Sequence, residues 1–409
     1  MEREPVLIQP DVAFLRDVMA AGGGGLKKCY QCAACSVVCE LSPQESPFPR
    51  RQMMEAQWGL KSRVLGDPAL WLCHNCGSCT AQCPRGVRPG DVLGALRNQA
   101  IREFAFPRFM GRLVSHSQAW PLLYLLPMLI FAALAWWAPK GAPTARVEAA
   151  NLFPITVLEP LFFGVSGFVL LAFGVGLGRC LRAVRARGAT GRIARGLLPA
   201  IWEIATNRRL RACNKKTWSV GHLLAAWGFM GLAVVGTAAG VGTGAGVLRT
   251  PLALFSPLKL LANAAALVLL GGSFLLLWER IRDPLPRAAS TYFDWFFLLT
   301  LAAAALTGIL AEIMRLAQIA VLMYSIYYLH LVLIFALLLY APYSKFAHLA
   351  YRSVALAGAG PWKPKAGIAK PLPCFSSPPP FIHSYPLDIT LTQYFFRYGH
   401  GHSSFLSDL

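Results

Sequence analysis

Two cysteine-rich stretches, CYQCAACSVVC (residues 29–39) and CHNCGSCTAQCP (residues 73–84), decide how the N-terminal part of this chain folds. Both follow the spacing C-x2-C-x2-C-x3-C, and together they hold eight of the eleven cysteines in the 409 residues. Three cysteines at this spacing wrap one 4Fe–4S cluster, while the fourth reaches across to a second cluster. By that pattern we expect two ligand sets, Cys29, Cys32, Cys35 and Cys83 for one cluster and Cys73, Cys76, Cys79 and Cys39 for the other.

The competing interpretation of these cysteines is structural zinc. Zinc sites use two separated C-x2-C pairs, whereas here the thiolates come in packed fours, which favours iron–sulfur clusters. The 33 residues between the motifs have helical character instead of the short strand-turn-strand spacing of a small βαββαβ ferredoxin. We therefore predict an α-helical, ferredoxin-type domain with two 4Fe–4S clusters over residues 1–108.

The composition places the rest of the chain in lipid. Hydrophobic residues make up 56% of the sequence and charged residues 14%, which is more apolar than a soluble domain usually tolerates. Each apolar stretch has the roughly 20 residues that a helix needs to cross about 30 Å of hydrocarbon. The six stretches lie near residues 119–138, 155–178, 218–240, 258–278, 293–313 and 319–341. We predict an all-α protein with a six-helix transmembrane bundle over residues 109–352, since buried helices of a soluble protein would carry charges on at least one face.

The basic residues indicate orientation and exclude nucleic-acid binding. The net charge is +20, but the lysines and arginines gather between apolar spans and not on one continuous face. Eleven basic residues separate the second and third spans, and residues 1–118 lack an apolar stretch that would serve as a signal peptide. The positive-inside rule thus predicts a multi-pass protein of the cytoplasmic membrane with both termini in the cytoplasm. The second-to-third loop holds either an interfacial helix around Ile201 to Cys213 or a solvated basic loop, and residues 353–409 are predicted to be an irregular tail.

Histidines in the bundle suggest haem b, because an ionisable side chain in a lipid-embedded helix is costly and haem b needs axial imidazoles from facing helices. The candidate ligands are His222, His348 and His330, with His222 and His348 as the expected pair. His330 and His348 are 18 residues apart, so they would share a face about 27 Å apart if one helix continued past Pro342.

The partner of His330 is open at this stage. The position ten residues after His222, which would suit a second haem, is Leu232. Three accounts remain: a single haem, a ligand such as Met230 or Met323, or a pairing of His222 with His330. His330 as a hydrogen-bonded core residue is a further alternative. For a quinone, the side chains able to bind its oxygens include Asp294, Glu312 and Glu159, each of which can equally be a span-end residue that faces headgroups.

The sequence around the cysteines resembles the heterodisulfide reductase C-type iron–sulfur proteins over about residues 25–105. The matching segments are CYQC at 29–32, RR at 50–51, GL at 59–60, LWLC at 70–73, CPRGV at 83–87 and ALRN at 95–98. The resemblance implies an electron relay to or from a flavin-containing partner, with the eight cysteines as ligands. Arg85, Arg88 and Arg97 would then either contact that partner or form a solvated basic face.

The histidine pattern of the bundle resembles the cytochrome b-type gamma subunit of respiratory nitrate reductase. The two parts together, over about residues 25–350, resemble the C-type membrane subunit of quinone-interacting membrane-bound oxidoreductase complexes. That resemblance implies electron transfer between menaquinone or ubiquinone and flavin/iron–sulfur subunits similar to heterodisulfide reductase A, in the adenylylsulfate reductase pathway of dissimilatory sulfur metabolism. The alternatives are a quinol-linked subunit of another heterodisulfide- or sulfite-reductase-type complex and a membrane-anchored iron–sulfur redox sensor.

Overall fold

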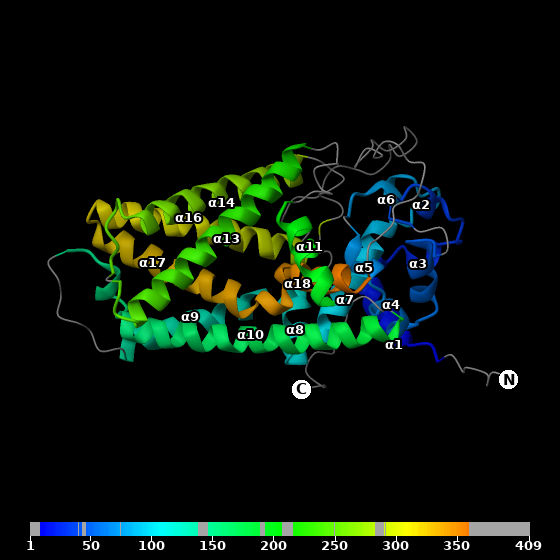
Figure 1. Cartoon of the computed structure of the whole chain (residues 1–409), viewed down its shortest axis with the longest axis horizontal. Coiled ribbons are helices and arrows are strands. Elements are labelled where there is room, and N and C mark those ends of the chain that lie inside the picture. Colours follow the sequence, from blue (N-terminus) through cyan, green and yellow to red (C-terminus); the bar gives the residue numbers. More distant parts are fainter. Residues whose placement is uncertain are drawn as a thin grey trace.

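The fold is all-α, as predicted. The computed structural model describes residues 9–39, 41–42, 46–73, 75–137, 146–188, 193–206, 216–248, 250–282, 290 and 292–359, and within these residues all regular structure is helical. The molecule is elongated, with the N-terminal helices at one end and long helices running away from them (Figure 1). Most of the predicted tail lies outside the described residues, but α18 (Lys345–Ala359) continues the helical part beyond residue 352.

Short helices pack around α7 to form the N-terminal part. Their bounds are α1 Val12–Val18, α2 Ala34–Val37, α3 Arg50–Gln57, α4 Lys61–Leu65, α5 Ala69–Leu72, α6 Ser78–Ala81 and α7 Pro89–Phe104. The Asp11 carboxylate caps α1 by accepting from the amide of Phe14 at 2.8 Å. Gly25 lies so close to the Val87 backbone that a Cβ would be 2.3 Å from its carbonyl oxygen, so only glycine fits there. This contact holds the approach to the first cysteine motif against the end of the second.

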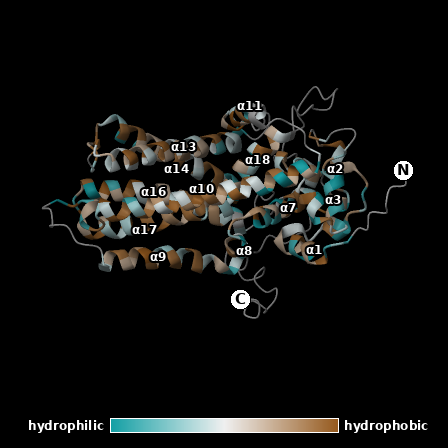
Figure 2. Ribbon diagram, turned by 60° about the horizontal axis from the view of Figure 1, so that its bottom comes forward, coloured by the Kyte–Doolittle hydropathy of each residue, from teal (hydrophilic) through white to brown (hydrophobic). Residues whose placement is uncertain are grey.

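Within the described part of the chain, six helices are long and apolar enough to cross a membrane, and they correspond to the six predicted spans. The spans are formed by α9 Trp120–Trp137, α10 Ile155–Ala186, α13 Lys216–Gly244, α14 Pro257–Arg282, α16 Tyr292–Leu316 and α17 Ala320–Leu339. Large apolar side chains such as Leu170, Leu267 and Val321 are exposed on the outside of the bundle, as a lipid-facing surface requires. Figure 2 shows the hydrophobic colouring concentrated on these helices and the hydrophilic colouring on the N-terminal part.

Small residues bring α13 and α14 into backbone contact. A Cβ at Gly228 would be 2.5 Å from the amide of Leu269, and a Cβ at Gly272 would be 2.4 Å from the amide of Ala225. In lipid, helices associate through such close packing because burying apolar surface gives little advantage over contact with lipid tails. The α13–α14 pair is thus a rigid unit of the bundle.

Two details differ from the expectations. The last span ends at Leu339, and a 3-10 turn at Ala341–Tyr343 separates it from α18, so no continuous helix joins His330 to His348. Pro342 explains the break, since its ring blocks helical bonding to the preceding turn.

The helix of the basic loop, α11, spans Ile193–Ala205 and so begins before the predicted start at Ile201, while residues 207–215 lie outside the described part. Its Leu198 and Trp202 side chains are exposed, which suits a membrane interface.

The two predicted domains share one hydrophobic core. Buried residues of the N-terminal helices pack in the same cluster as Val184 near the end of α10 and Tyr351 of α18. Residues 179–186 of α10, beyond the predicted end of the second span, supply part of this contact. The N-terminal part therefore rests directly on the end of the bundle, with no linker between the two.

Candidate functional site

The two cysteine motifs adopt the same backbone path. Gln31 and Ala33 in the first loop have positive φ values of 59° and 66°, and Asn75 and Gly77 at the equivalent positions of the second have 55° and 79°. Left-handed backbone at three non-glycine residues costs energy and persists only where the surrounding structure enforces it. Each loop then enters a one-turn helix, α2 or α6, and the Asn75 amide donates to the Cys73 Sγ at 3.4 Å. This repeated turn directs the thiols of each motif inward.

The thiols gather in two sets that cross between the motifs. Burial raises the pKa of Cys35, and the neighbouring thiols that raise it further are Cys29, Cys83 and Cys32. We call these four the outer cysteines, because Cys32 is exposed and the four line a hollow that opens beside the exposed Tyr30. The Arg85 guanidinium lies over the Tyr30 ring, 4.1 Å from its centroid.

The other four thiols, Cys39, Cys73, Cys76 and Cys79, are the inner cysteines. Burial raises the pKa of Cys39 to about 12, and the charges of Cys73 and Cys76 contribute to the increase. The pKa of Cys79 is raised well above its usual range by burial and then by Cys73, Cys76 and Cys39. Thiols this crowded and desolvated need a bound cationic centre to remain thiolates. Among the described residues, no group of three or more His, Cys, Asp or Glu converges to hold a single metal ion.

The inner cysteines adjoin the membrane bundle through Trp71, which is completely buried in α5 two residues before Cys73. The Trp71 ring lies 5.8 Å from the His348 ring and 4.9 Å from the Tyr351 ring, both on α18. Arg352 donates to the Trp71 carbonyl oxygen at 3.5 Å. A predicted haem ligand therefore contacts the helix that leads directly into the second cysteine motif.

His348 of α18 and His222 of α13 lie near enough for their charges to interact, as the pairing expected from the sequence requires. Burial lowers the pKa of His348 well below its usual range, and the charges of Arg97, Arg352, Lys345 and His222 lower it further. A neutral imidazole is the form that ligates iron. Phe229 of α13, on the same helix as His222, packs against Phe346 of α18 in a tilted arrangement with 4.5 Å between ring centroids, and this contact joins the two histidine-bearing helices.

His330 lies elsewhere, against α16. Its Nδ1 is 3.0 Å from the Ala304 carbonyl oxygen and 3.2 Å from the Thr307 hydroxyl, and its ring covers Gly308. These contacts match the alternative of a hydrogen-bonded core residue. The two methionines considered as haem ligands lie in different environments, since Met323 is buried while Met230 is exposed on the bundle surface.

The acidic quinone candidates all have partners. Asp294 pairs with Lys345 at 2.8 Å, and its charge adds to the burial that raises the pKa of Asp91 on α7, so it belongs to the junction with the N-terminal part. Glu312 pairs with Lys259 at 3.2 Å and with Arg315 at 2.9 Å. Glu159 accepts a hydrogen bond from Thr243.

The three arginines predicted to face a partner or solvent separate into different environments. Arg85 is exposed, and Arg88 pairs with Asp91 at 2.6 Å. Arg97 is buried at 9% exposure, so neither interpretation holds for it. Sequence reasoning missed its position because Arg97 lies on the inward face of α7, a face that can be recognised only from the buried run of Val92, Leu93, Leu96 and Ala100 around it.

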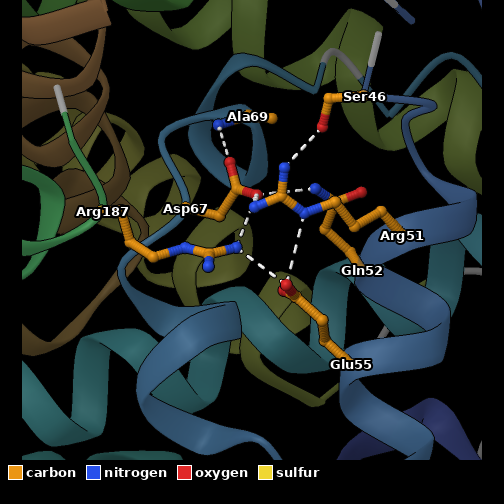
Figure 3. Close-up of polar contacts among 7 residues, drawn as sticks. All are labelled: Ser46, Arg51, Gln52, Glu55, Asp67, Ala69 and Arg187. Atoms are coloured by element: carbon orange, nitrogen blue, oxygen red, sulfur yellow. Dashed lines mark hydrogen bonds and ion pairs between the residues drawn. The ribbon is translucent and has the colours of Figure 1, made fainter. Parts of the chain in front are cut away.

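An ion-pair network fastens the N-terminal part to α10. Arg187, at the end of that helix, approaches Glu55 at 2.8 Å and Asp67 at 3.8 Å, and Arg51 reaches the same two carboxylates at 3.3 and 3.9 Å (Figure 3). The Gln52 amide also donates to Asp67 at 2.8 Å. Because the Glu55 and Asp67 side chains are only 4% and 10% exposed, these charges are poorly screened.

Comparison with known proteins identifies the N-terminal part. A family model described as a 4Fe-4S dicluster domain matches residues 25–87. The C-type component of the H(2):CoB-CoM heterodisulfide,ferredoxin reductase of Methanothermobacter thermautotrophicus is 39% identical over 106 residues, which cover 25% of this chain and 57% of that protein. A heterodisulfide reductase C-like protein of Archaeoglobus profundus is 33% identical over 105 residues, which cover 25% and 55%.

A third relative, the C-type component of the ferredoxin:CoB-CoM heterodisulfide reductase of Methanosarcina mazei, is 35% identical over 89 residues, 22% of this chain and 55% of that protein. The chain thus spans about half the length of the curated relatives it matches. No solved structure matches it. The N-terminal part is thus similar to heterodisulfide reductase C-type proteins and matches a 4Fe-4S dicluster domain, and it is joined, within the described residues, to six helices capable of crossing a membrane.

Proposed function

We propose that this chain is the membrane subunit of a quinone-linked oxidoreductase complex, which transfers electrons between the quinone pool and a cytoplasmic flavin/iron–sulfur partner. The outer and inner cysteines hold one 4Fe–4S cluster each, and His222 and His348 hold a haem b. Within this proposal, residues 1–108 form the iron–sulfur domain, residues 109–352 form the cytochrome b-like domain, and both termini are cytoplasmic. When bound, the clusters and the haem each accept and release single electrons.

The observation that carries the proposal is the meeting of the two parts at Trp71. Trp71 of α5 lies two residues before Cys73, and its ring lies 5.8 Å from the ring of His348 on α18. A shared hydrophobic core excludes water from the junction and holds its geometry, and the Arg187 network reinforces it. A protein that used its clusters only for sensing would not require a histidine pair at this point of contact.

The chain's own residues also account for the direction in which each cluster faces. The outer cysteines open to the surface beside Tyr30 and Arg85, where a soluble partner can approach. Among the inner cysteines, Cys73 directly follows α5, whose Trp71 packs against His348 and Tyr351 of α18. We infer the order partner, outer cysteines, inner cysteines, haem and quinone, with electrons passing in either direction.

The finer assignment is to the C-type membrane subunits of quinone-interacting membrane-bound oxidoreductase complexes, with partners similar to heterodisulfide reductase A and a role in the adenylylsulfate reductase pathway. Three features support it: the heterodisulfide reductase C-like domain, the six spans and the His222–His348 pairing at their junction. The curated relatives carry the names of heterodisulfide reductase components, so a quinol-linked subunit of that kind of complex is the second candidate.

A quantitative pyridine haemochrome assay on the purified full chain, with iron counted in parallel, tests the proposal. One or two haems b per chain with about eight further iron atoms is the expected result. The same iron without haem would overturn the quinone-linked proposal and leave a membrane-anchored cluster protein. In nanodiscs, added menaquinol should then reduce the clusters, as read by EPR; clusters that stay oxidised would contradict the quinone link.

A further inference from the structure

Two buried hydrogen-bond donors at the junction are incompletely paired among the described residues: one lacks an acceptor and the other lacks an anion. The Trp71 side chain is fully buried, and its Nε1 has no hydrogen-bond partner among the described residues. Arg97 contacts only carbonyl oxygens, those of Leu70 and Cys73, both 3.5 Å from the same Nη1, and none of the described carboxylates pairs with it. A buried cation without an anion and a buried N–H without an acceptor are each costly, so their coincidence needs a cause.

Both donors lie on the iron–sulfur domain and beside His348. The carbonyl groups that Arg97 contacts flank Trp71 in the chain, which places the guanidinium next to that residue. The Trp71 ring lies 5.8 Å from the His348 ring. Arg352 reaches the same place, since it donates to the Trp71 carbonyl oxygen at 3.5 Å. The junction therefore concentrates positive charge and N–H donors around one candidate haem ligand.

We propose that Trp71 and Arg97 form a carboxylate-binding cradle for a propionate of the haem held by His348. The inference rests on the proposed function, because it requires that haem. A propionate supplies both the negative charge that Arg97 lacks and the acceptor that the Trp71 Nε1 lacks, and a guanidinium binds carboxylates with a paired, planar geometry.

The inner cluster is the other anionic group within reach, and the structure favours the propionate over it. The Trp71 ring, whose Nε1 lacks an acceptor among the described residues, lies 5.8 Å from the His348 ring, so this donor is beside the proposed haem ligand. Arg352 adds to the cradle from the membrane side, since it donates to the Trp71 carbonyl oxygen and lies 3.9 Å from Glu203. A haem bound in this way would be held by both parts of the protein, by its iron from the bundle and by its propionate from the iron–sulfur domain.

The variants that test the cradle are Trp71→Phe and Arg97→Gln in the full chain. Phenylalanine keeps the buried ring and removes the N–H, so Trp71→Phe should fold even if Arg97→Gln does not. Each variant removes a hydrogen bond to a charged group and should speed the transfer of haem to apomyoglobin by about tenfold. Both should shift the haem midpoint potential to more negative values, because less positive charge or fewer donors face the haem. Arg97→Lys, which keeps the charge, should shift it less.

Matched controls separate the cradle from general loosening. Arg102→Gln alters a half-buried arginine of the same helix that pairs with Asp17, and Trp58→Phe alters a half-exposed tryptophan of the same domain. Neither should change haem transfer or the haem potential. The EPR potential of the outer cluster serves as an internal reference and should stay constant in Trp71→Phe and Arg97→Gln.

The outcomes distinguish this inference from the proposed function. Cluster potentials that shift while the haem potential stays constant would assign the two donors to the inner cluster and overturn the cradle. Unchanged haem behaviour in both variants would also overturn it, although the proposed function would stand. A wild-type chain that binds no haem would overturn the proposed function itself.

Discussion

Replacing Arg187 with alanine should loosen the iron–sulfur domain from the end of α10. Arg187 is 18% exposed and contacts the almost fully buried Glu55 at 2.8 Å, a geometry in which removing one partner of an ion pair costs about 3–5 kcal/mol. Arg51 remains 3.3 Å from Glu55 in the variant, so that carboxylate keeps one cation. We therefore expect a smaller cost, about 2 kcal/mol, which corresponds to a roughly 30-fold increase in local opening.

Hydrogen exchange of the full chain in nanodiscs measures this opening directly. Amides of α3 and α5 should exchange roughly 30-fold faster in Arg187→Ala, while those of α13 and α14 should keep the wild-type rate. Arg185→Ala is the matched control, because Arg185 lies two residues earlier on the same helix and its side chain is exposed. Equal exchange in the two variants would refute the role of the network. A double-mutant cycle with Glu55→Gln should also be non-additive, since the two side chains share one contact.

Three further predictions concern the cofactors and the bundle. Cys76→Ser should cost the inner cluster and leave the outer cluster's EPR signal; loss of both would contradict two independent sets. His222→Ala should abolish a low-spin haem b signal with the clusters intact, whereas His330→Ala should keep that signal, and the reverse pattern would make His330 the ligand. Gly272→Ala should lower the free energy of unfolding by about 1–3 kcal/mol in thermal melts, because its Cβ would lie 2.4 Å from a backbone amide, while Gly271→Ala, with no atom within 4 Å, should be neutral.

The features that could be predicted from the sequence are local ones. The turn around each cysteine motif depends on spacing within eleven residues, and six spans follow from runs of apolar residues, so both could be recognised without knowing the fold. The interruption after Leu339 was open at the sequence level, since a proline either kinks or ends a helix depending on the helices packed around it.

Features that depend on contacts between distant segments could not be predicted from the sequence. The burial of Arg97 depends on the faces of α5 and α18 that cover it, and the continuity of the two predicted domains depends on α10 extending to Ala186 and meeting Glu55 through Arg187. The positions of the histidines suggested His222 and His348 as a pair, yet the contact of His348 with Trp71 of the iron–sulfur domain appears only once α18 is folded against α5. Spacing and hydrophobicity act within a segment and so are visible in the sequence by itself, whereas burial and pairing arise from packing between segments and were decided by the tertiary structure alone.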